Sequence, residues 1–137
     1  MTFAGINYLA IVIAAVAAFV FGGIYYRALA EHWMKAIGIS KKSLDKKASA
    51  TPLIITIIAE LIMAWVLAGL IAHLGAGQVT ALNGIVSGAF VWLGFVATTL
   101  VVNNAFGMRK PMLSVIDAAH WLAVLAIMGA IIGAFGV

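Results

Sequence analysis

The chain has 137 residues, of which 66% are hydrophobic and only 9% charged, and it carries a net charge of +4 with no cysteine. Soluble domains are roughly half apolar and about a quarter charged, so this composition excludes an ordinary soluble domain and indicates a membrane protein. The absence of cysteine excludes disulfides, thiolate nucleophiles and thiolate metal ligands. All eight basic residues fall in two loops, which leaves no separate basic domain, so no nucleic-acid partner is expected.

Four long apolar stretches fill the sequence, and each exceeds the roughly 20 residues that one helical crossing of a bilayer needs. They cover about residues 3–26, 52–74, 81–104 and 112–135. We therefore predict an all-α protein, an integral membrane four-helix bundle in which residues 1–137 form a single membrane domain. Proline stands at the start of the second and fourth stretches, where the first helical turn has no internal use for an N–H group.

The orientation follows from the basic residues. Lysine and arginine are concentrated in residues 27–51 and in the turn with Arg109 and Lys110, whereas residues 73–80 contain neither. The positive-inside rule places both basic loops in the cytoplasm. Both termini are then expected on the outer, periplasmic side of the cell inner membrane.

The basic cytoplasmic loop, residues 27–51, is predicted to begin with a short helix. Leu29, Trp33 and Ile37 recur every four residues and would share one helical face. Gly38 is expected to end this helix, and the lysine-rich segment beyond it to remain solvated beside acidic lipid headgroups. A helix with one apolar face lies along the inner membrane interface, so the lipid bilayer itself is its expected partner.

Small residues at four-residue spacing mark faces on which membrane helices pack closely. Such stripes occur in three of the four spans, at Ala14, Ala18 and Gly22, at Gly84 and Gly88, and at Gly129 and Gly133. The sequence leaves open whether they pack within one chain or between chains. Four short helices enclose little volume, so a transported solute would favour a homo-oligomer, whereas docking through the stripes would favour a larger membrane complex.

Ionisable residues inside the apolar stretches predict a polar site within the membrane, because such groups are costly in hydrocarbon unless they are partnered or hydrated. At about 1.5 Å per residue, Glu60, Asp117 and His120 lie roughly 9 to 13 Å from the cytoplasmic ends of their spans. The predicted site opens toward the cytoplasm and comprises Glu60, Asp117, His120, Thr98, Asn103, Tyr25 and Tyr26.

Within this site, Asp117 and His120 are three residues apart and share a helical face, so the carboxylate is expected to orient or charge the imidazole. Glu60 and His120 are expected to share a proton. The simpler interpretation is that these polar groups only hold the helices together.

The sequence assigns no catalytic residue, so an enzyme is not favoured. Ser114 precedes His120 by six residues on a helix and should point elsewhere, which leaves no pair of nucleophile and base. One imidazole and two carboxylates from separate helices match no strong metal-ligand motif. Neither a metal nor a cofactor is expected.

Several short motifs together resemble a known family. They are Gly22-Gly23-Ile24-Tyr25-Tyr26, Trp33-Met34-Lys35 with Gly38, Gly94-Phe95, and His120 followed by Gly129 and Gly133. They resemble domain of unknown function 1761, a family of short bacterial four-span membrane proteins. The resemblance implies fold and membrane location, and it brings no activity. Glu60 and Asp117 are not among the matching motifs.

These observations favour a protein that binds or conducts a proton, an ion or a small polar solute through its polar layer as a homo-oligomer. The alternative is a non-catalytic accessory or scaffold subunit of a larger membrane complex. The first expectation depends on the common depth of the ionisable residues. The second depends on the small-residue stripes and the small size of the chain.

Overall fold

The computed structural model describes residues 5–137, and within them every regular element is a helix. The predicted first span begins at Phe3, which lies outside the described residues. The helices, in chain order, are α1 (Tyr8–Ala28), α2 (Ala30–Ile37), α3 (Lys41–Lys46), α4 (Thr51–Ala72), α5 (Ala81–Val91), the π-helical segment η1 (Trp92–Ala97), α6 (Thr98–Phe106) and α7 (Pro111–Phe135).

Four helical segments are long and apolar enough to cross a membrane: α1, α4, the continuous helix from α5 through η1 to α6, and α7. Their mean hydropathies lie between 2.0 and 2.5. The four-span, all-helical prediction is thereby confirmed, with helix ends within two residues of the predicted ends for the second, third and fourth spans. Pro52 and Pro111 do occupy the first turns of α4 and α7.

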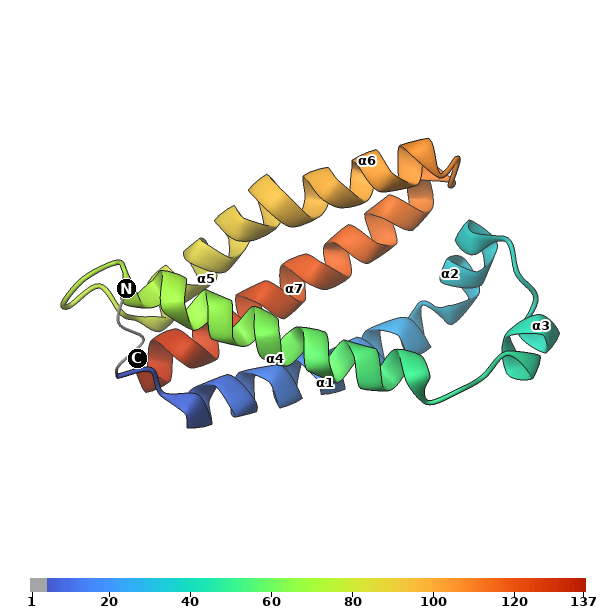
Figure 1. Ribbon diagram of the computed structural model, residues 1–137. Helices are drawn as coiled ribbons and strands as arrows, with labels where there is room; N and C mark the ends of the chain where they lie inside the picture. The colour runs from blue at the N-terminus through green and yellow to red at the C-terminus, as the bar shows by residue number, and fades with distance from the viewer. Residues whose placement is uncertain (1–4) are drawn as a thin grey trace.

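The helices form a bundle around α7, which contacts α1, α2, α4, α5 and α6. Figure 1 shows α2, α3 and the α6–α7 turn at one end of the bundle, and the α4–α5 turn at the other. The two basic loops therefore share an end, and the side-chain amine of Lys110 donates to the carbonyl oxygen of Lys35 at 2.9 Å between them. The helix predicted after the first span is present as α2, and Gly38 ends it at φ +81°.

The small-residue stripes are used for packing inside the chain. Gly84 and Gly88 of α5 are buried against α7, where a methyl group on Gly84 would overlap the carbonyl oxygen of Gly129. A methyl on Gly133 would overlap the carbonyl oxygen of Thr80. On the other side of α7, Ala14 and Ala18 of α1 are completely buried in the main core. Within the chain, the stripes thus pack α1 and α5 against the rest of the bundle.

The main core lies in the half of the bundle that contains the α4–α5 turn. Its members are Ile6, just before α1, and residues from the first half of α1, the second half of α4 and the second half of α7. A smaller cluster, built on Ala36, Leu113 and Ile116, closes the opposite end. The early residues of α4 are largely exposed, and Figure 1 shows α4 and α7 diverging toward the basic loops. The candidate site lies between these two clusters.

Candidate functional site

His120 of α7 lies at the centre of a group of aromatic rings. Its imidazole is 3% exposed, and its ring centroid is 4.8 Å from those of Tyr26 and Trp121, 5.5 Å from that of Tyr25 and 6.1 Å from that of Phe21. Phe21, Tyr25 and Tyr26 belong to α1, whereas Trp121 follows His120 on α7. Nδ1 of His120 is buried and has no hydrogen-bond partner.

Gly22 allows this close approach of α1 to α7. A Cβ atom at this position would lie 2.9 Å from Nε2 of His120, closer than real contacts allow. At Gly23, one position further along, a Cβ atom would have nothing within 4 Å. Gly22, predicted as a packing residue, therefore also shapes the surroundings of the imidazole.

The two tyrosines near the end of α1 are hydrogen-bonded to α7. The hydroxyl of Tyr25 donates to the carbonyl oxygen of Ile116 at 2.8 Å, and the hydroxyl of Tyr26 donates to Oδ1 of Asp117 at 2.7 Å. The hydrogen bond that Asp117 accepts comes from α1, and Nδ1 of His120 has no partner, so no contact supports the expected pairing of Asp117 with His120. Asp117 serves as a link between helices.

Glu60 of α4 differs from Asp117 in having no partner. Its side chain is fully buried, and neither carboxylate oxygen has a hydrogen bond. The expected proton shared with His120 has no supporting contact, since Glu60 and Nδ1 of His120 are both unpartnered. An unsatisfied polar group of this kind costs free energy in a folded protein, so its retention calls for an explanation.

Glu60 and His120 both line one pocket, of about 440 Å³, between α1, α4 and α7. We call it the inner pocket; its walls are Phe19, Gly22, Gly23, Tyr26, Leu53, Thr56, Glu60, His120 and Trp121. The walls are mostly apolar and aromatic, with a few polar groups, which is the usual make-up of a small-molecule site. A volume of this size falls within the roughly 300–1,000 Å³ range of such sites.

A second pocket, of about 480 Å³, adjoins the inner pocket on the side of the basic loops. We call it the outer pocket; it is lined by Tyr26, Ala30, Trp33, Met34, Leu44, Pro52, Thr56 and Asp117. Tyr26 and Thr56 line both pockets, so they stand at the boundary between them. The hydrogen bond between Tyr26 and Asp117 lies at this boundary.

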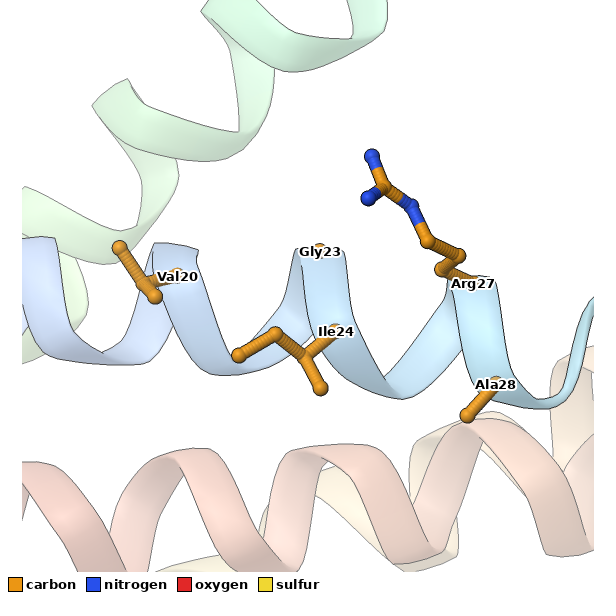
Figure 2. Close-up of a pocket in the computed structure, with 5 residues that line it drawn as sticks. All are labelled: Val20, Gly23, Ile24, Arg27 and Ala28. Carbon is orange, nitrogen blue, oxygen red and sulfur yellow. The ribbon is translucent and has the colours of Figure 1, made fainter.

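A further hollow, of about 490 Å³, lies along α1 alone (Figure 2). It is lined by Val20, Gly23, Ile24, Arg27 and Ala28, and Arg27 is the only charged residue among them. Because Val20 and Ile24 are more than half exposed, this hollow faces the surroundings of the bundle. It has the character of a lipid-facing groove, and we assign no ligand to it.

Two predicted site residues lie apart from this cluster. Thr98 is exposed and its hydroxyl donates to the carbonyl oxygen of Gly94 in its own helix, at 2.8 Å, and Asn103 is also exposed. The third span instead reaches α7 through Trp92, whose indole N–H donates to the carbonyl oxygen of Ala118 at 2.7 Å, and through Asn104, which donates to the hydroxyl of Ser114 at 3.0 Å.

The sequence reasoning also missed residues that line the inner pocket. Thr56 lies four residues before Glu60, so helical spacing could have identified it as a neighbour on the same face. Phe19 and Leu53 carried no such signal, because apolar residues fill both helices. Within residues 5–137, no three His, Asp or Glu side chains gather closely enough to hold a metal ion.

Comparison with known proteins gives one match. A family model described as "Protein of unknown function (DUF1761)" matches residues 9–133. No curated protein and no solved structure matches the chain. The matched segment contains all four candidate spans almost completely, together with every residue of the two pockets.

Proposed function

The chain belongs to the DUF1761 family of proteins of unknown function, and from its site we propose that it is a multi-pass protein of the cell inner membrane that binds a small polar solute or ion in the inner pocket. Family membership supplies no activity, so the proposal depends on the site itself. The observation that carries it is the complete burial of Glu60 on the pocket wall with both carboxylate oxygens unpartnered.

A comparison of Glu60 with Asp117 supports a ligand-binding role. Polar groups that only hold membrane helices together are hydrogen-bonded across the helix interface, as Asp117 is to Tyr26. Glu60 makes no such bond and lines the inner pocket instead. Intramembrane ionisable residues in this situation typically mark a path or site for a solute.

Native mass spectrometry of the protein in nanodiscs prepared from its own membrane tests this function without a guess about the ligand. The wild-type protein should retain an additional small mass, and Glu60→Gln should lose it because the amide cannot supply two acceptor oxygens. Glu31→Gln, which makes the same change on the exposed face of α2, should retain it. Absence of a bound mass that depends on Glu60 would contradict the proposal.

The same spectra give the oligomeric state. A homo-oligomer is the expected form, whereas a stoichiometric larger partner would favour the accessory or scaffold subunit. Only the small size of the chain still supports that alternative, because the stripes that motivated it are occupied by packing between α1, α5 and α7.

The orientation that we propose places both basic loops in the cytoplasm and both termini outside. It is supported by the position of all the basic residues at one end of the bundle. Since the chain contains no cysteine, single-cysteine labelling is unambiguous. A membrane-impermeant maleimide should label Ala76→Cys in intact spheroplasts, and should label Lys42→Cys only after the membrane is permeabilised. The reverse pattern would overturn the orientation.

A further inference from the structure

We infer that the ligand of the inner pocket is a small organic cation, an ammonium group attached to an apolar body. This inference rests on the proposed function and adds the chemical class of the solute. The charges of the residues that line the two pockets support it. Among the residues described as lining the inner and outer pockets there is no lysine or arginine, whereas Glu60 lies in one and Asp117 in the other. An anion would therefore meet carboxylates without a compensating positive group.

The free hydrogen-bonding atoms are mainly acceptors. Both oxygens of Glu60 are unpartnered, and a carboxylate accepts hydrogen bonds from several donors at once. Nδ1 of His120 is also unpartnered and is an acceptor whenever the ring proton is on Nε2. A protonated amine carries two or three N–H donors in a small volume. It can satisfy Glu60 while its charge is matched.

The aromatic walls favour the same class of ligand. Tyr26, Trp121 and Phe19 all line the inner pocket. The faces of such rings attract cations, most strongly where water is excluded. The rest of the lining is apolar, so the body of the ligand should be apolar as well.

A bare metal ion fits this site poorly. A metal would need more ligands than Glu60 and His120 provide, and no cluster of three such residues exists in the part of the chain that the structure describes. A single ion would also leave most of the roughly 440 Å³ unfilled. An ammonium group at Glu60 with a ring-sized apolar body uses both the charge and the space.

The walls also indicate how such a ligand enters. Leu53 lines the inner pocket and yet is 58% exposed on the outside of α4, so the pocket reaches the outer surface of the bundle between α1 and α4. Amphiphilic cations concentrate at the membrane interface, and Leu53 lies at the start of α4, near the expected inner interface. The outer pocket is lined by Leu44 of α3 and provides a second route of entry, from the side of the basic loops.

Three small ligands of similar shape test the inference by isothermal titration calorimetry in nanodiscs, with empty nanodiscs as the blank. They are phenethylammonium, the neutral 2-phenylethanol and the anionic 3-phenylpropionate. We expect wild-type protein to bind phenethylammonium at least tenfold more tightly than either of the others. Glu60→Gln should abolish this preference, and Glu31→Gln should retain it.

A second variant tests the position of the cation beside His120. Gly22→Ala places a methyl group against Nε2 of the imidazole and should weaken phenethylammonium binding about tenfold without removing the charge of Glu60. If phenethylammonium does not bind, or if either of the other ligands binds as tightly, the inference is wrong. The proposed function would still stand if native spectra show a Glu60-dependent mass that is neutral or anionic, and it fails separately if they show no such mass.

Discussion

Replacing Glu60 with methionine should make the folded protein more stable while removing its bound solute. Methionine has nearly the same length as glutamate and no polar atoms, and the glutamate oxygens that it replaces have no partners in the fold. Burying a polar group without a hydrogen bond costs about 1–3 kcal/mol by mutational measurement. We therefore expect the free energy of unfolding to rise by about 1–3 kcal/mol, as measured by steric trapping in bicelles.

Asp117→Asn is the control for this prediction, because Asp117 is a carboxylate that the fold does use. Weakening its hydrogen bond with Tyr26 should lower the free energy of unfolding by about 0.6–1.7 kcal/mol, from the average to the largest value measured for hydrogen bonds between membrane helices. The two carboxylates should thus respond with opposite signs. If Glu60→Met instead destabilised the protein as Asp117→Asn does, Glu60 would be a structural residue and the ligand site would lose its main support.

An increase in stability on losing Glu60 has a functional meaning. Proteins retain destabilising residues mainly where a function needs them, and local features that disagree with the rest of a fold gather at such sites. The main core is built from buried apolar side chains, whereas the buried carboxylate of Glu60 makes no hydrogen bond. On the proposed function, a solute in the inner pocket offsets the cost of this burial.

The four spans and most of their ends could be predicted because they depend on local properties of the sequence. Apolar length identified four helices, proline marked two of their starts, and Gly38 marked the end of α2. The six-residue α3 was not predicted, since its lysines suggested only a solvated segment. Its start at Ser40, which accepts a hydrogen bond from the N–H of Ser43, is a recognisable cap signal.

The sequence predicts how far along each span a site residue lies, but it does not predict which face of the helix that residue occupies. Counting residues along each span gives a height in the membrane, but a face of a helix is known only once its neighbours are known. Thr98 has about the right height and lies on the exposed face of the third span, whereas Glu60 turns inward. Likewise, the spacing of Asp117 and His120 could not show that Tyr26, from another helix, would take the carboxylate.

Introducing a single methyl group at Gly84 should disrupt the bundle more than any other substitution considered. The Cβ atom of Gly84→Ala would overlap the carbonyl oxygen of Gly129, and backbone atoms cannot move aside as a flexible side chain can. Overpacking in a close-packed interior usually costs about 1–3 kcal/mol, and occasionally more where the backbone must shift. We expect a loss of at least about 3 kcal/mol of unfolding free energy by steric trapping.

Gly94→Ala provides the matched control in the same span. A Cβ atom there has nothing within 4 Å, so the substitution should leave the free energy of unfolding within about 0.5 kcal/mol of wild type. A small effect at Gly84 would mean that α5 does not pack against α7 at Gly129.

The third span depends on this contact more than the other spans do, because little of its surface is buried and its closest approach to the bundle runs through glycine. Loss of the contact between α5 and α7 should therefore loosen the third span, which is then held through the hydrogen bonds from Trp92 and Asn104 to α7. Because α1, α4 and the inner pocket between them and α7 should remain assembled, we expect Gly84→Ala to lower stability before it lowers ligand binding.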